Sequence, residues 1–139
     1  EIGVYHRVDR AFDGGYLVLR EQKEWYEFFI LYDKTFHQTA SQSVYVYSAV
    51  FAPTDLNTTI FHQWQYFDEK KDTWVTTDKL SYAIVGGRDG GYRGFSTKTS
   101  ITSGKWRTNV VTARGQLIGR AAFSVVRADT VPPLETVVR

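Results

Sequence analysis

The best candidates for binding chemistry lie in residues 86–94, which read GGRDGGYRG. Two arginines flank an aspartate there, and a guanidinium group can bind a carboxylate or another oxyanion through two parallel hydrogen bonds. Either arginine can also pair internally, with Asp89 or Asp78, and structural pairing of both is the alternative to a ligand site. The ligand-binding residues that we predict are Arg88, Asp89, Tyr92, Arg93 and, from another part of the chain, Trp74.

The glycines of this stretch have two explanations. Glycine-rich backbone can present several N–H groups to a phosphate, but the known phosphate-loop fingerprints, which require a following helix, are absent. Residues 92–98 instead have the composition of a strand, and an Asp-Gly turn supplies the positive φ angles of a β-hairpin. We therefore predict a hairpin bend here, and the same turn chemistry in the Asp-Gly-Gly of residues 13–15.

Aromatic residues are abundant, because four tryptophans, nine tyrosines and nine phenylalanines make up 16% of the chain. Flat rings can stack on sugar faces, but a β-protein also needs large rings in its core. Successive strand side chains point to opposite sides, so alternation predicts that Trp64 and Trp106 are buried. Trp74 comes just after the charged turn of residues 68–72, and we expect it to be exposed and available to a ligand or partner.

Catalytic and metal-binding patterns are weak in this sequence. His62 is in phase with Trp64 on a predicted strand, where a histidine is usually a buried side chain with satisfied nitrogens. His6 and His37 fall in separate predicted loops, and no metal-ligand spacing or nucleophile signature occurs. The carboxylates at positions 68, 69 and 72 are explained as parts of a solvated loop. We therefore predict no enzymatic activity, no metal and no cofactor.

Composition and charge exclude several classes of protein. The formal net charge is +2 with both signs mixed along the chain, which disfavours a nucleic-acid partner. Cysteine is absent, so neither disulfides nor thiolate chemistry is available. No apolar run approaches the roughly 18 residues of a membrane span. Methionine is absent even at position 1, so we expect the sequence to be a piece of a larger protein, with its targeting segment removed.

Short apolar runs with a period near two, separated by turn residues, indicate an all-β fold. Strands are predicted at residues 16–20, 25–32, 44–51, 60–67, 79–85, 92–98, 105–112 and 116–126. About seven to nine such strands are typical of a two-sheet antiparallel sandwich of immunoglobulin-like type, with a barrel as the alternative. Residues 44–51 are apolar on both faces, as expected of a central strand. Pro132-Pro133 lacks two backbone donors, so we predict one sandwich domain over residues 1–126 and a tail or linker over residues 127–139.

Residues 50–126 combine several motifs that are individually weak. The motifs are His62-x-Trp64, Gly86-Gly87-Arg88-x-x-Gly91-Tyr92-Arg93 followed by Ser96 and Lys98, Gly104-x-Trp106, and Gly115-Gln116-x-Ile118-Gly119 ahead of Phe123. Together they resemble the domain-of-unknown-function 2914 family, a bacterial domain. The resemblance implies a domain that often stands beside multi-pass membrane segments on their extracytoplasmic side, and it implies no established activity.

The aromatic richness and the arginine-bearing loop predict a non-catalytic binding module. As the resemblance implies, we expect an extracytoplasmic location, in the periplasm or at the cell surface, in a membrane-anchored parent protein whose anchor is outside this chain. The first hypothesis is recognition of a carbohydrate or cell-envelope polymer. The alternative is a protein-interaction domain that serves an attached membrane protein through a sheet edge or an apolar patch. A hydrolase that depends on His62 is the third hypothesis.

Overall fold

The computed structural model describes residues 2–22, 34–50, 59–82 and 92–139, and within these ranges all regular elements are β-strands. The strands are β1 (Ile2–Tyr5), β2 (Arg7–Arg10), β3 (Tyr16–Glu21), β4 (Lys34–Gln38), β5 (Val44–Val50), β6 (Ile60–Asp68), β7 (Thr73–Tyr82), β8 (Tyr92–Lys98), β9 (Gly104–Thr112), β10 (Leu117–Arg127) and β11 (Leu134–Val138). They form a large sheet in the order β4-β10-β9-β6-β7, a middle sheet β1-β5-β8 and a small sheet β11-β3-β2.

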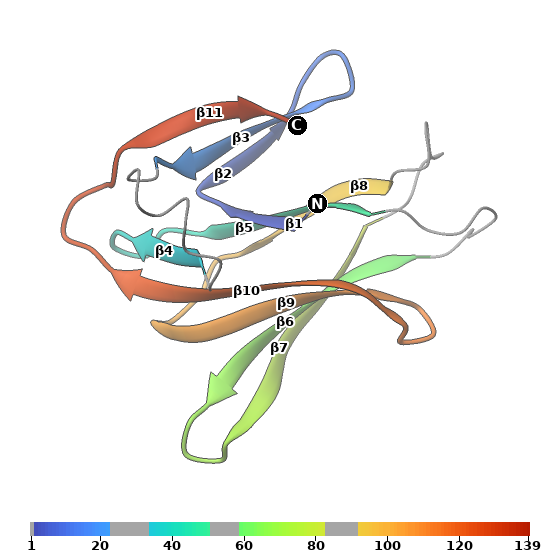
Figure 1. Cartoon of the computed structure of the whole chain (residues 1–139), viewed down its shortest axis with the longest axis vertical. Coiled ribbons are helices and arrows are strands. Elements are labelled where there is room, and N and C mark those ends of the chain that lie inside the picture. The colour runs from blue at the N-terminus through green and yellow to red at the C-terminus, as the bar shows by residue number, and fades with distance from the viewer. Residues whose placement is uncertain (1, 23–33, 51–58, 83–91) are drawn as a thin grey trace.

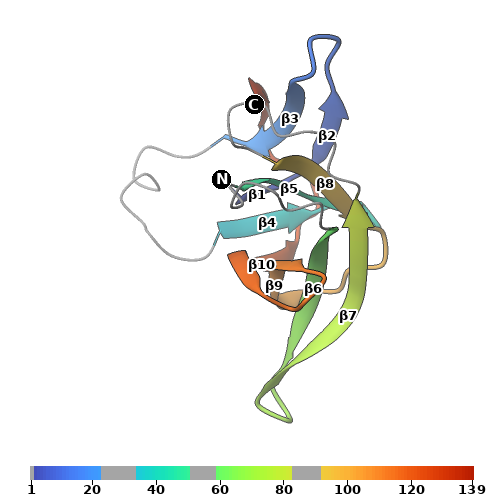
Figure 2. The ribbon, with the colours of Figure 1, turned by 90° about the vertical axis from the view of Figure 1, so that its right-hand side faces the viewer.

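The three sheets lie in layers, with the middle sheet between the other two (Figures 1 and 2). The position of β5 in the middle sheet, between two cores, explains why its sequence is apolar on both faces. Val44 and Val46 point to the large sheet, whereas Tyr45 and Tyr47 point to the small sheet. The expectation of a central strand at this position is therefore confirmed. The hairpin of β6 and β7 extends past the other layers at the lower end of Figure 1.

The first core fills the space between the large and middle sheets. Trp64 and Trp106 are 0% and 3% exposed, so alternation predicted both correctly. The Trp64 ring meets Phe123 edge-on, with ring centroids 6.2 Å apart, an arrangement that aromatic pairs prefer. Val44, Val46 and other apolar side chains complete this core. Full burial of one such aliphatic or aromatic side chain stabilises the fold by about 1.5–3 kcal/mol.

The second core is an aromatic cluster between the middle and small sheets. Tyr47 packs against Tyr16 with ring centroids 5.0 Å apart and against Tyr5 at 6.4 Å. Phe95 from β8 meets Tyr16 edge-on at 6.3 Å, and Val18 is completely buried beside these rings. Much of the aromatic richness of the sequence is therefore used in this core.

Tight turns join three hairpins, β2–β3, β6–β7 and β9–β10. The hairpin predicted at residues 86–94 is wrong, because the flanking strands β7 and β8 belong to different sheets. Between β2 and β3, Gly14 has a φ of 84°, and the carboxylate of Asp13 accepts the backbone N–H of Gly15. Gly115 has the same φ between β9 and β10. In the acidic turn between β6 and β7, Asp68 accepts two backbone N–H groups and Asp72 adopts a φ of 49°. The solvated-loop interpretation of this turn is confirmed, because its residues 69–72 are exposed.

The predicted all-β sandwich is confirmed, with more strands than the expected seven to nine. Four described strands were not predicted: β1, β2, β4 and β11. All sheet pairs are antiparallel except β4 with β10, which is parallel. The described strands form open sheets rather than a closed barrel. The strand predicted at residues 25–32 lies outside the described residues, and so does the end of the one predicted at 79–85.

The C-terminal segment corrects the expectation of a tail. Strand β11 pairs with β3 along its whole length, Val137 opposite Val18, and Val137 packs against the second core. The two prolines lie just before β11, where the carbonyl of Pro133 still accepts the backbone N–H of Gln22 at 2.9 Å, and β11 is an edge strand, where fewer backbone donors are needed. In the described ranges, no helix combines the length and the apolar character needed to cross a bilayer.

Candidate functional site

The large sheet turns one face to the middle sheet and the other to solvent. Register places on this second surface, here called the outer face, the side chains of Phe61, Gln63, Gln65 and Phe67 from β6, Trp74, Thr76 and Lys79 from β7, Lys105, Arg107 and Asn109 from β9, and Arg120 and Ala122 from β10. Because residues opposite each other in a ladder share a face, these side chains form rows that run across four strands. The outer face is thus a continuous surface of rings, amides and cations.

A chain of hydrogen bonds crosses the outer face. Asn109 donates from Nδ2 to Oε1 of Gln63 at 3.0 Å and to Oε1 of Gln65 at 2.9 Å. Its own Oδ1 accepts Nε–H of Arg120 at 2.6 Å. Gln65 Oε1 also accepts Nε–H of Arg107 at 2.6 Å. The side-chain amides of Gln65 and Asn109 therefore hold the two guanidinium groups in place through the arginine Nε atoms. The terminal N–H groups of both arginines take no part in these bonds.

Each ring of the outer face lies next to a cation. The guanidinium carbon of Arg107 lies 4.2 Å from the Trp74 ring centroid. The ammonium of Lys79 lies 4.6 Å from the Phe61 ring, and that of Lys105 lies 5.8 Å from Phe67. These distances are within the range of cation–π attraction. Burial, with the charge of Arg120 as a second cause, lowers the pKa of Arg107 below its ordinary value.

His62 belongs to the core, as alternation predicted. It is 0% exposed, with Nε2 2.8 Å from the hydroxyl of Ser48 and Nδ1 2.7 Å from that of Ser96. The indole N–H of Trp64 donates to the same Ser96 oxygen at 3.0 Å. Burial lowers the pKa of His62 to about 4, so the ring is neutral at physiological pH. Its two nitrogens are satisfied by serines of the middle sheet, away from solvent.

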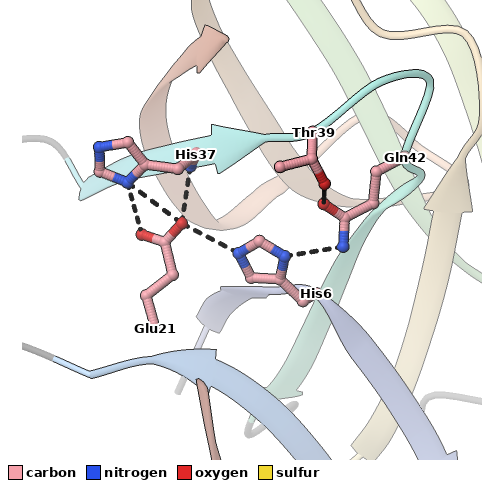
Figure 3. A network of polar contacts seen from close by, with 5 residues as sticks. All are labelled: His6, Glu21, His37, Thr39 and Gln42. Carbon is pink, nitrogen blue, oxygen red and sulfur yellow. Dashed lines mark hydrogen bonds and ion pairs between the residues drawn. The ribbon is translucent and has the colours of Figure 1, made fainter. Parts of the chain in front are cut away.

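A second polar cluster joins β3, β4 and the bend between β1 and β2 (Figure 3). Glu21 Oε1 accepts the backbone N–H of His37 at 2.7 Å, and Glu21 Oε2 lies 3.1 Å from Nδ1 of the same residue. Nε2 of His6 lies 2.9 Å from Glu21 Oε1. Gln42 completes the cluster, with its Nε2 2.8 Å from Nδ1 of His6. The expectation that His6 and His37 lie in separate loops is corrected, since β4 contains His37 and the fold brings both rings to one carboxylate.

The groups of this cluster satisfy one another. Burial alone raises the pKa of Glu21, but the hydrogen bonds from His6 and His37 outweigh it, and the net pKa is lowered. Because the Gln42 amide N–H donates to Nδ1 of His6, Nε2 is the ring atom that bears hydrogen and donates to Glu21. No group of three or more metal-ligating side chains within the described ranges is arranged to hold a metal ion.

The residues predicted for ligand binding do not form one described site. Arg88 and Asp89 lie outside the described residues, and Tyr92 begins β8 opposite Val50. Arg93 is exposed on β8, and its Nη1 donates to the backbone oxygen of Arg139 at 3.4 Å. Trp74 is partly exposed on β7 of the large sheet, so it and Arg93 lie on different sheets.

Asp78, considered as an internal partner of the loop arginines, pairs instead with Lys98 of β8. Its side chain therefore joins the large sheet to the middle sheet. The arginines of the outer face were not among the ligand-binding residues predicted from the sequence. A signal for them exists, because the polar Lys105, Arg107 and Asn109 alternate in the sequence with Trp106, Thr108 and Val110 along one strand. Strict alternation of this kind places all three on one surface.

Comparison with known proteins gives a family match and similar solved structures. None of the curated proteins matches the chain. Among solved structures, that of the NK cell receptor Nkp44, described as a triggering partner in natural cytotoxicity, is similar with a TM-score of 0.49 and 13% sequence identity, over 70% of this chain and 99% of that chain. Residues 57–125, from just before β6 almost to the end of β10, match the family described as proteins of unknown function, DUF2914. The resemblance to the DUF2914 family that the motifs indicated is therefore confirmed over these residues.

Proposed function

We propose that this protein is a non-catalytic, extracytoplasmic binding module that recognises a carbohydrate or another cell-envelope polymer through the outer face. The observation that carries the proposal is the row of fixed amide and guanidinium groups, bounded by Trp74, that crosses β7, β6, β9 and β10. Sugar hydroxyls are recognised by such planar donors and acceptors, and apolar ring faces cover the C–H groups between them. The extracytoplasmic location rests on the family resemblance.

We expect polar groups to contribute more to this recognition than stacking does. Phe67 and Trp74 lie with ring centroids 5.1 Å apart and planes at 57°, so they do not form a flat platform. Arg107 covers one face of the Trp74 ring. The amides Gln63, Gln65 and Asn109 are already oriented by their mutual hydrogen bonds, and such pre-organisation reduces the entropy that binding costs.

The non-catalytic part of the proposal is supported by the position of His62. A general base must reach its substrate through a hydrogen bond or a single water. His62, Ser48 and Ser96 are instead enclosed between two sheets, at 0%, 0% and 7% exposure. A broad hydrolase screen tests this directly, and turnover that is abolished by His62→Ala would overturn it.

Calorimetry with a panel of polymers tests the binding function. The panel contains neutral dextran, chitin oligosaccharides, polygalacturonate and soluble peptidoglycan fragments. We expect heat of binding for at least one of them, and an affinity at least about tenfold lower for Trp74→Ala, equivalent to about 1.4 kcal/mol. Phe12→Ala is the control, because Phe12 is a fully exposed ring on the β2–β3 turn, away from the outer face. Absence of binding to the whole panel at millimolar concentration would contradict the proposal.

A protein partner is the second candidate, and the edge of β7 favours it. In the described sheet β7 pairs only with β6, and Val75 is 41% exposed on the projecting hairpin. Unpaired edge strands can accept a further strand from a partner. Recovery of one stoichiometric partner in a pull-down, lost in a Val75→Lys variant but kept in Trp74→Ala, would favour this function over polymer recognition.

A further inference from the structure

Arg107 and Arg120 lack a counter-ion in the part of the chain that the structure describes. Arg107 donates its Nε–H to Gln65, and Arg120 donates its Nε–H to Asn109, and both acceptors are neutral amide oxygens. A guanidinium group has five N–H donors, so four remain on each terminal fork. By contrast, Arg20 on the small sheet pairs with a carboxylate, that of Glu135.

The two arginines are close enough to share a ligand. Arg120 lies directly opposite Asn109 in the ladder, and Arg107 is two residues away on the same strand. Such diagonal neighbours on one face have Cβ atoms roughly 7–8 Å apart. Ala122 lies directly opposite Arg107, is exposed, and leaves the space beside that guanidinium open. Two like charges held this close favour a bound anion, which would relieve their repulsion.

The rest of the outer face has the same sign of charge. Lys79 and Lys105 are exposed there, and neither forms an ion pair with a described residue. None of the residues that define the outer face is acidic. The formal charge of this single surface is therefore higher than the +2 of the whole chain, and it is complementary to a polyanion.

We propose that the outer face binds an acidic polysaccharide, with a carboxylate or phosphate of the polymer between Arg107 and Arg120. This inference rests on the proposed function and names its ligand class. The terminal N–H groups of each arginine can donate to two oxygens of a carboxylate or phosphate. The amides of Gln65 and Asn109 fix the orientation of the two guanidinium groups. Neighbouring sugar hydroxyls would contact the partly exposed Gln63, and repeated acid groups along the polymer would reach Lys79 and Lys105.

The decisive variant is Ala122→Glu, which supplies an internal carboxylate beside Arg107. Calorimetry compares polygalacturonate, a glycerol-phosphate polymer and neutral dextran at low and at physiological salt. We expect one or both acidic polymers to bind, more weakly at higher salt because exposed charges are screened. Ala122→Glu should lower this affinity at least tenfold, whereas the isosteric control Ala122→Gln should change it less than twofold. The two acidic arms distinguish a carboxylate ligand from a phosphate ligand.

Arg120→Gln gives an independent test, since it removes one charge at an exposed position and retains hydrogen bonding to Asn109. The same tenfold loss is expected. Equal binding of dextran, unaffected by Ala122→Glu and Arg120→Gln, would overturn the acidic ligand and leave the polymer-binding function intact. No binding to any polymer would overturn both. Tighter binding of a dT oligonucleotide than of either acidic polymer would assign the face to single-stranded nucleic acid instead.

Discussion

His62 illustrates how burial decides the protonation state of a side chain. Both of its nitrogens contact serine hydroxyls, which can donate to one nitrogen and accept from the other. A neutral imidazole needs this combination of one donor and one acceptor, whereas a protonated ring needs two acceptors. Burial lowers the pKa of His62 to about 4, against an ordinary value near 6.5. The serine contacts are therefore structural, and they have a measurable consequence for stability.

We predict that His62 makes the fold less stable as the pH falls from about 6.5 to about 4. In this window the unfolded chain binds a proton at His62 and the folded chain does not, so the slope is close to 1.4 kcal/mol per pH unit and the full loss is about 3 kcal/mol. Above the unfolded pKa the stabilisation is complete. Urea unfolding measured at intervals of half a pH unit gives the slope.

The His62→Gln variant is the control for this pH dependence. Its side chain can still contact Ser48 and Ser96 but cannot titrate, so the slope between pH 6.5 and 5 should become shallower by about one proton. Glu21, whose pKa is lowered, loses its own contribution only below its ordinary value near 4.5, and this window avoids it. An unchanged slope in the variant would show that His62 is protonated in the folded state.

At the level of elements, the start of β9 depends on a glycine. Gly104 has a φ of 136°, and a Cβ built there would lie 2.8 Å from Cε2 of Tyr66, whose ring packs against Trp106 at 5.0 Å. We predict that Gly104→Ala destabilises the fold by roughly 2–4 kcal/mol, from left-handed strain and overpacking together. Gly115→Ala is the matched control, since its Cβ would meet nothing within 4 Å. Gly115→Ala should lower the free energy of unfolding by the backbone strain alone, roughly 1–2 kcal/mol. Urea unfolding of both variants measures the difference.

Strand β11 offers a second test at the same scale, because two neighbouring valines on it point to opposite faces and differ in burial. Val137 packs against the second core, and Val138 is 67% exposed. We predict that Val137→Ser costs about 1–2 kcal/mol and Val138→Ser less than about 0.5 kcal/mol, although both lose the same strand propensity. Equal effects in thermal unfolding would show that β11 is not docked on the small sheet in solution.

The elements also show what the sequence could predict. Strands β5 and β6 were placed almost to the residue, because runs with an apolar face report burial directly. Strand β11 was missed because its pairing with β3 joins residues more than a hundred positions apart, and local composition contains no trace of a distant partner. The His6–Glu21–His37 cluster was also missed, because its residues come from three separate segments that only the fold brings together. Arg107 and Arg120 have a local signal in strand alternation, but their proximity depends on the β9–β10 register.

At the scale of the whole molecule, the middle sheet belongs to both cores. Val46 is fully buried in the first core and its neighbour Tyr47 is 1% exposed in the second, on the same strand. Truncating a β5 side chain in one core therefore destabilises a strand that also contributes side chains to the other core. Folding of the three layers should be cooperative, as it is for most single domains of this size.

We predict that Tyr47→Leu, which removes the ring contacts with Tyr5 and Tyr16, destabilises all three layers together by roughly 1–3 kcal/mol. The three described tryptophans, Trp64, Trp74 and Trp106, lie on the large sheet. In a Trp25→Phe background, which removes the tryptophan outside the described residues, their fluorescence reports a layer that Tyr47 does not face. The midpoint of urea unfolding should fall equally by fluorescence and by far-ultraviolet circular dichroism, and Val46→Ala should behave in the same way. If circular dichroism instead shows an earlier transition that fluorescence does not detect, the small sheet unfolds on its own and the middle sheet does not couple the two cores.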